Sequence, residues 1–202
     1  MRLFRPCFFA GCLYPGAIFR IKTNEKLLCL TFDDGPDRDT TPLILDILER
    51  HNIRALFFCN GKAAEKFPDL VSMIVSKGHL IGNHGYDHLN GWRTSVKRYL
   101  ADVSDAAPHT SSLLFRPPYG RLKYCQFKKI RKTYKIFFWD IMPYDFDKKF
   151  EDGKSLEILK KMIRPGSVIV LHDTSLSSAK NILEEFILFS GRKGYRFVCP
   201  GF

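Results

Sequence analysis

The sequence predicts a single α/β domain built on a parallel sheet that closes as a barrel. Short apolar runs alternate along the chain with segments whose apolar residues recur at helical spacing, and this alternation is typical of consecutive β-α units. The clearest of the strand-like runs end in clusters of polar residues. Because functional residues of parallel barrels collect at the carboxyl ends of the strands, we expect one site on one rim of the barrel.

The length of the chain, 202 residues with 45% hydrophobic and 26% charged residues, fits one domain with a full core. This composition excludes disordered and fibrous proteins. We expect residues 27–202 to form the barrel and residues 1–26 to form an N-terminal extension that packs on it. The expected oligomeric state is a monomer.

An excess of basic residues gives the chain a formal net charge of +11. Such a charge indicates either an anionic partner or a surface that keeps the protein in solution. Because the basic residues form no long run, we favour the second explanation and expect no nucleic-acid partner. No apolar stretch approaches the length of about 20 residues that a transmembrane span needs.

The six cysteines show neither a C-x-x-C pair nor zinc-knuckle spacing, so we expect reduced, structural thiols. Residues 1–20 resemble a secretory signal only faintly, because Pro6 interrupts the apolar run and residues 14–16 make a poor cleavage site. We therefore favour a cytoplasmic location over an envelope-associated one.

The first expected strand, residues 27–32, ends in Asp33 and Asp34 before a Gly-Pro break. Successive strand side chains point to opposite sides, so these two aspartates can serve different functions. Two adjacent carboxylates repel each other, so we expect a cation beside them, either a metal ion or an arginine, that compensates their charge. Alternatively, the aspartates cap the helix that follows. This stretch alone leaves both interpretations open.

The remaining elements alternate in order. Buried strands are expected at residues 54–59, 79–82, 112–115, 135–139, 167–171 and 195–198. Helices with one apolar face are expected at residues 42–51, 68–77, 96–103, 124–132, 156–163 and 179–186. Glycine and proline mark several ends, among them Gly78 and Pro165.

Two histidines, His84 and His88, follow the expected strand at residues 79–82. Their spacing brings two imidazoles together across a helical turn or a tight loop, and with one carboxylate they make a three-ligand metal site that leaves a position for water. Histidines at this spacing are also often solvated or hydrogen-bonded. Gly82, Gly85 and the equivalent strand-end position of the aspartate pair favour the metal site.

Five polar segments follow one another along the chain: TFDDG at 31–35, HGYDH at 84–88, RPPYG at 116–120, WD through DF at 139–146, and VLHD at 170–173. In this order they resemble the motifs of polysaccharide deacetylases, the NodB-homology domain of carbohydrate esterase family four. The likeness covers about residues 27–199. It implies a distorted (β/α)7 barrel and a metal-dependent hydrolase that removes N-acetyl groups from amino sugars, such as those of chitooligosaccharides or peptidoglycan.

The resemblance implies a metal site and a general base. Asp34, His84 and His88 would hold one divalent ion, most often zinc in such enzymes, with cobalt or nickel as alternatives. Asp33 would take a proton from the attacking water, which agrees with the ability of a carboxylate to finish a deprotonation that a metal ion has eased. Arg116 would pair with Asp33 and fix its position.

The resemblance also implies a general acid and substrate contacts. His172 would protonate the departing amine and would be held in its charged state by Asp145. A backbone N–H at Tyr119 would receive the oxyanion. Phe146 and Val170, which shares a strand face with His172, would form the floor of a small pocket for the acetyl methyl group.

Two residues depart from the family pattern. Gly85 stands where a serine or threonine hydroxyl usually braces the loop after the first metal histidine, and Phe146 stands where a tryptophan is usual. Neither change removes a residue of the implied mechanism. Trp92 and Tyr86 lie in the same region, and each either stacks on a sugar ring or simply packs.

Two other functions stay open at this level. One is an amidase with a non-carbohydrate substrate, because a fold does not fix a substrate. The other is a non-catalytic sugar-binding module, which is expected to have lost an acid, a base or a ligand, whereas this chain retains all of them. The sequence does not separate polymer from oligosaccharide substrates, because the expected rim loops are short and carry no repeated aromatic platform.

Overall fold

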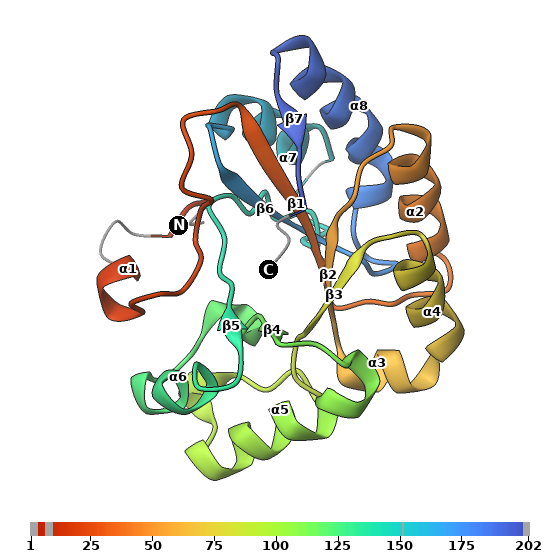
Figure 1. The fold of residues 1–202 in the computed structure, drawn as a ribbon. Helices are drawn as coiled ribbons and strands as arrows, with labels where there is room; N and C mark the ends of the chain where they lie inside the picture. Colours follow the sequence, from red (N-terminus) through yellow and green to blue (C-terminus); the bar gives the residue numbers. More distant parts are fainter. Residues whose placement is uncertain (1–3, 7–9, 151, 200–202) are drawn as a thin grey trace.

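The fold is centred on a seven-stranded parallel sheet surrounded by helices (Figure 1). The computed structural model describes residues 4–6, 10–150 and 152–199. Along the sheet the strand order is β5-β4-β3-β2-β1-β6, and β7 pairs with the start of β1. The predicted single α/β domain with a parallel sheet is confirmed.

The strands are β1 (Leu27–Asp33), β2 (Leu56–Cys59), β3 (Leu80–Asn83), β4 (Leu114–Phe115), β5 (Lys135–Ile136), β6 (Ser167–His172) and β7 (Arg196–Phe197). The α-helices are α1 (Ala10–Leu13), α2 (Thr41–Arg50), α3 (Gly61–Lys66), α4 (Pro68–Ser76), α5 (Val96–Thr110), α6 (Tyr124–Ile130), α7 (Asp152–Met162) and α8 (Ala179–Arg192). Two 3-10 turns, η1 (Gly91–Arg93) and η2 (Pro118–Gly120), lie in rim loops.

Irregular chain closes the barrel between β5 and β6, which are the two ends of the strand order. Beyond β5, Ile141 forms an isolated parallel bridge with Ile169 of β6. The backbone N–H of Val170 donates to the Ile141 carbonyl at 2.9 Å, and the N–H of Asp140 donates to the Val168 carbonyl, also at 2.9 Å. The barrel is therefore closed but distorted on this side.

The strand expected at residues 135–139 is shorter than predicted, because its last residues turn to another partner. The N–H of Phe138 donates to the carbonyl of Ile18 at 2.8 Å, and Ile18 forms a bridge with Phe137. Tyr14 and Phe19 stack on the Phe138 ring, with centroid distances of 4.9 and 4.6 Å. The chain before β1 thus pairs with residues 137–138, which follow β5.

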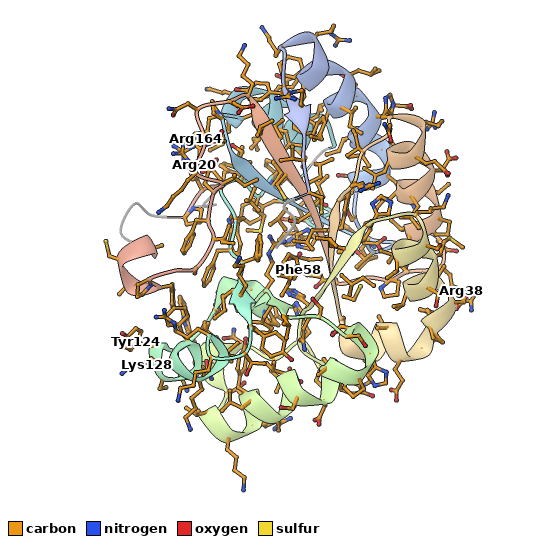
Figure 2. All side chains as sticks on the ribbon, in the orientation of Figure 1. Arg20, Arg38, Phe58, Tyr124, Lys128 and Arg164 are labelled. Atoms are coloured by element: carbon orange, nitrogen blue, oxygen red, sulfur yellow. The ribbon has the colours of Figure 1, made fainter. Side chains whose placement is uncertain are left out.

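Alternation along the strands separates two apolar layers. Phe57 and Cys59 of β2 pack outward with the helices, as Leu30 and Phe32 of β1 do. The inward layer is a cluster of Leu56, Phe58, Leu114 and Phe137, and Phe58 lies near the centre of the molecule in Figure 2. The inner side of the barrel is therefore packed, and polar groups reach it only near the strand ends.

Parallel register brings the strand ends together. Asp33, the last residue of β1, is paired with His172, the last residue of β6, and with Phe58 on the other side. Asn83 ends β3 beside Cys59. Strands that are far apart in the sequence therefore end at the same rim, and the loops that follow them lie together there.

Two short helices, α1 and α3, and both 3-10 turns are absent from the sequence prediction. Five described cysteines are free, and burial raises the pKa of the Cys29 thiol to about 12; Cys7 lies outside the described residues. No helix in the described part of the chain is long and apolar enough to cross a bilayer.

Candidate active site

A cavity of about 520 Å³ opens at the rim where the strands end. It is lined by most of the residues that the sequence singles out: Asp33, Asp34, His84, His88, Tyr119, Phe146 and His172. Two further residues that the sequence singles out are buried behind this lining. Arg116 is hydrogen-bonded to Asp33, and Asp145 is hydrogen-bonded to His172. Val170 is buried on β6 and does not line the cavity. The five motif segments, distant in sequence, therefore meet in one place.

Three side chains form a group that could hold a metal ion. The ligand atoms of Asp34, His84 and His88 all lie within 4.8 Å of one another. Nε2 of His88 is 3.0 Å and Nε2 of His84 is 3.4 Å from Oδ1 of Asp34. One carboxylate and two imidazoles are a usual donor set for zinc and other divalent metals, and three protein ligands leave coordination positions for water.

The hydrogen bonds around this group fit a metal ion. Nδ1 of His84 lies 2.8 Å from the carbonyl oxygen of Arg116, so this nitrogen donates, and in the neutral ring Nε2 carries a lone pair toward Asp34. Oδ1 of Asp34 is buried and receives no well-directed hydrogen bond from any described residue. With His84 in this neutral tautomer, a cation between its Nε2 and Oδ1 of Asp34 would satisfy both lone pairs.

The backbone brings both aspartates to the same cavity. Asp34 has a left-handed φ of 76°, so the alternation of β1 stops at Asp33. Nε2 of His84 lies 3.9 Å from Asp33 and 3.4 Å from Asp34. Burial by itself raises the pKa of Asp34, but interactions with both imidazoles hold it below its usual range. The expectation that the two carboxylates point to opposite sides is wrong, although their partners differ.

Asp33 is held by a buried arginine. Nη1 of Arg116 donates to Oδ1 of Asp33 and to the hydroxyl of Thr31, each at 2.6 Å, and Nη2 donates to the Phe138 carbonyl at 2.9 Å. The guanidinium is fully buried and lies 4.1 Å from the centroid of the Phe58 ring. These contacts fix Oδ1 of Asp33 and leave Oδ2 on the side of His84, 3.9 Å from its Nε2.

His172, which also lines the cavity, is held by Asp145. Nδ1 of the imidazole lies 3.0 Å from Oδ1 of Asp145, whose Oδ2 accepts the backbone N–H of His172 at 2.7 Å and the Ser177 hydroxyl at 2.6 Å. Burial by itself lowers the pKa of His172, but the charge of Asp145, with smaller contributions from Asp34 and Asp33, raises it to about 9. The ring is therefore an imidazolium at neutral pH.

Asp102 of α5 is a site residue that the sequence did not reveal. Its carboxylate accepts the backbone N–H of Asp87 at 2.7 Å and that of Tyr86 at 3.2 Å, inside the loop between the two metal-site histidines. A side chain at Gly85, which has a φ of 74°, would place Cβ 2.5 Å from Oδ2 of Asp102. Gly85 thus leaves room for a carboxylate that braces the loop, where the family pattern has a hydroxyl.

The remaining predicted contacts lie on the cavity wall. Tyr119 has a left-handed φ of 59° in η2, and its ring packs edge-on against His88 at 4.5 Å. Phe146 packs in the same manner against His172 at 4.5 Å and is 39% exposed. Neither Tyr86 nor Trp92 lines the cavity, and the Tyr86 hydroxyl donates to Glu65 at 2.5 Å.

Comparisons with known proteins agree with this geometry. Residues 20–134 match the family model of polysaccharide deacetylase. A peptidoglycan-N-acetylglucosamine deacetylase of Bacillus cereus is 36% identical over 185 residues, which are 87% of this chain and 67% of that protein. A chitooligosaccharide deacetylase of Azorhizobium caulinodans is 31% identical over 78% of this chain and 79% of its own length.

Solved structures extend the likeness to the fold. The crystal structure of the Bc1960 peptidoglycan N-acetylglucosamine deacetylase, in complex with an N-oxidanyl-benzamide, superposes with a TM-score of 0.88 and 32% identity over 96% of this chain and 94% of that chain. The family model covers more than half of the sequence, and the likeness in fold covers nearly all of it. The chain therefore belongs to the polysaccharide deacetylase family, a family of carbohydrate deacetylases.

Proposed function

We propose that this protein removes the N-acetyl group from GlcNAc units of an oligo- or polysaccharide, with one divalent metal ion, most often zinc in this family. The observation that carries the proposal is the convergence of Asp34, His84 and His88 with the buried pairs Asp33–Arg116 and His172–Asp145 around one cavity. The similar proteins act on peptidoglycan or on chitooligosaccharides, as their names state.

Asp34, His84 and His88 would hold the ion in this proposal. A bound divalent ion acts as a Lewis acid that activates water and polarises the acetyl carbonyl. The hydrogen bond from Nδ1 of His84 to the Arg116 carbonyl keeps Nε2 of that ring turned toward the ligand group. The Asp102 contacts with the intervening loop position the two histidines relative to each other.

Asp33 would be the general base of the reaction. Its Oδ1 is occupied by Arg116, whereas its Oδ2 faces His84 at 3.9 Å, on the side where the attacking water would stand. An arginine that holds one carboxylate oxygen keeps the other oxygen in place for proton transfer. The proton of the attacking water would pass to this Oδ2.

His172 would be the general acid. Its Nδ1 is held by Asp145, so Nε2 is the atom that would donate a proton to the departing amine nitrogen. Because its pKa is raised to about 9, the imidazolium is present at neutral pH. The proposed base and acid come from the ends of the paired strands β1 and β6.

The oxyanion and the acetyl group would meet η2 and the aromatic wall. The N–H of Tyr119, in the left-handed turn after Pro118, is our candidate donor to the developing oxyanion. Phe146, which packs on His172, is our candidate wall for the acetyl methyl group. Val170 lies beneath His172 on the same strand face and would support the ring rather than contact the methyl group, because it does not line the cavity.

Acetate release tests the proposal. Purified protein is stripped with a chelator, reloaded separately with zinc, cobalt or nickel, and incubated with chitooligosaccharides and with peptidoglycan glycan fragments. We expect no release from stripped protein and release after reloading. Release of another acid from a non-carbohydrate amide, with none from either glycan, would instead support the amidase alternative. Sugar binding without release in any metal form would support a non-catalytic module.

A further inference from the structure

We propose that Arg121, with Trp92 and Tyr119, forms a second saccharide subsite that binds a sugar bearing a carboxylate next to the unit that is deacetylated. The inference rests on the proposed function and narrows its substrate class to anionic glycans. Arg121 directly follows the RPPYG segment and lines the cavity. It belongs to none of the hydrogen-bonded pairs that form the reaction site.

These three side chains continue outward from the metal group. The Tyr119 ring contacts His88 with centroids 4.5 Å apart. The guanidinium carbon of Arg121 lies 6.0 Å from the Tyr119 ring centroid and 5.3 Å from that of Trp92. Contacts therefore connect His88 through Tyr119 and Arg121, which line the cavity, to Trp92, which does not.

Two large aromatic side chains are exposed in this row. Tyr119 is 58% exposed and Trp92 is 59% exposed. Exposed aromatic rings beside a cleft that binds sugars offer flat apolar faces for stacking on pyranose rings. Neither Trp92 nor Tyr86 lines the cavity itself, but Trp92 contacts the cavity residue Arg121, whereas the Tyr86 hydroxyl is bonded to Glu65. The stacking surface is thus set by Trp92 and Tyr119.

The guanidinium of Arg121 lacks an acidic partner among the residues that the structure describes. Arg93 and Arg98 also lack an acidic partner within that part of the chain. Arg121, however, is the arginine among the residues that line the cavity, whereas Arg116 beneath it is paired with Asp33 at 2.6 Å. The planar guanidinium binds a carboxylate through two parallel hydrogen bonds and stacks on aromatic rings at the same time. A carboxylate on the substrate would fill the position that no described side chain takes.

The loop that carries Trp92 is fixed against the Arg121 segment. Nε2 of the buried Gln126 donates to the Gly91 carbonyl at 3.0 Å, and Nζ of Lys123 donates to the Thr94 carbonyl at 2.9 Å. A Cβ on Gly91 would stand 2.2 Å from the Arg121 carbonyl oxygen, so only glycine allows this approach. The subsite is therefore preorganised, which lowers the entropic cost of binding.

The test compares one glycan in two charge forms. Peptidoglycan glycan strands freed of their stem peptides carry a carboxylate on alternate sugars, and amidation of these carboxylates gives a neutral glycan of the same length. The quantity measured is the ratio of kcat/KM for acetate release from the two forms, for wild type, Arg121→Gln and Lys128→Gln. Lys128 is a matched control: its Nζ lies 5.3 Å from the Tyr124 ring centroid, on α6 and outside the cavity (Figure 2).

Wild type should prefer the carboxylate form, and Arg121→Gln should reduce this preference about tenfold through KM, as expected for one charge-assisted contact. Lys128→Gln should keep the wild-type preference. Equal loss on both forms in Arg121→Gln, or an unchanged preference, would overturn the inference. Calorimetric binding of both forms to Asp33→Asn protein supplies the same comparison without turnover. Absence of acetate release from every glycan by wild type would instead contradict the proposed function.

Discussion

Asp145 binds His172 with both of its carboxylate oxygens. Oδ1 lies 3.0 Å from the imidazole Nδ1, and Oδ2 accepts the backbone N–H of the same residue at 2.7 Å. The Ser177 hydroxyl also donates to Oδ2. One carboxylate therefore sets the orientation of the ring and supplies the charge that keeps it protonated.

Asp145→Asn should lower the pH above which the enzyme loses activity. A general acid must be protonated, and His172 has a pKa raised to about 9, so wild-type kcat should fall as the pH rises through about 9. The amide removes the charge that favours the imidazolium, and the alkaline limb of the pH profile should move to lower pH. Asp69→Asn, at an exposed carboxylate on α4, is the control and should keep the limb. A limb that stays in place in Asp145→Asn would contradict this role.

His84→Ala should remove metal binding. The variant loses one of the three ligands, and its neighbours cannot replace the Nε2 that faces Asp34 at 3.4 Å. Elemental analysis of the purified proteins measures the metal-to-protein ratio. His109→Ala, at a partly exposed histidine that lies 3.8 Å from Glu65, should keep the wild-type ratio. Equal metal content in His84→Ala and wild type would contradict the assignment of His84 as a metal ligand.

Arg116→Met should destabilise the fold more than Asp33→Asn does. The methionine leaves the buried Asp33 carboxylate without its cation, and breaking such a pair costs about 3–5 kcal/mol. The asparagine keeps an oxygen that can accept from Nη1 of Arg116. Urea denaturation monitored by circular dichroism gives the free energies of unfolding. Equal stability of the two variants would show that the pair does little for the fold.

Gly85→Ser should weaken metal binding, although serine or threonine is usual at this position in the family. A Cβ would stand 2.5 Å from Oδ2 of Asp102, and the left-handed φ of 74° also disfavours a side chain. Displacement of Asp102 would free the loop N–H groups of Tyr86 and Asp87, and loss of such supporting contacts costs about 10–100-fold in metal affinity.

A double variant separates the clash from the backbone strain. Asp102→Ala removes the carboxylate that meets the new Cβ, so Gly85→Ser should weaken metal affinity less in this background than in wild type. Asp105→Ala, at an exposed position of α5, is the matched control. Competition with a chelating dye measures the affinities. Strictly additive losses would argue against direct contact between positions 85 and 102.

The strand and helix pattern could be predicted because most elements carry their own periodicity. The run at β6, for example, is buried at every position, and its alternation assigns Ile169 and Leu171 to the layer under the helices. The motif order then places Asp33 and His172 at the carboxyl ends of strands, and the parallel register pairs them. Local pattern and topology thus determine where the site lies.

Side-chain contacts between distant segments could not be predicted. The bracing role of Asp102 depends on the approach of α5 to the histidine loop, which no spacing encodes. The turn at Asp34 overrides the alternation that strand periodicity implies, because its φ of 76° lies outside β geometry. The early end of β5 depends on Ile18, more than a hundred residues away.

The central claim is that Asp33 is the base of a metal-dependent deacetylation. The most direct measurement is kcat for acetate release from a GlcNAc oligosaccharide by wild type and Asp33→Asn, each loaded with zinc to the same measured content. We predict an intact fold, an equal metal content and a loss of about 10²–10⁴ in kcat with little change in substrate binding. Turnover near the wild-type rate in fully loaded Asp33→Asn would contradict the account.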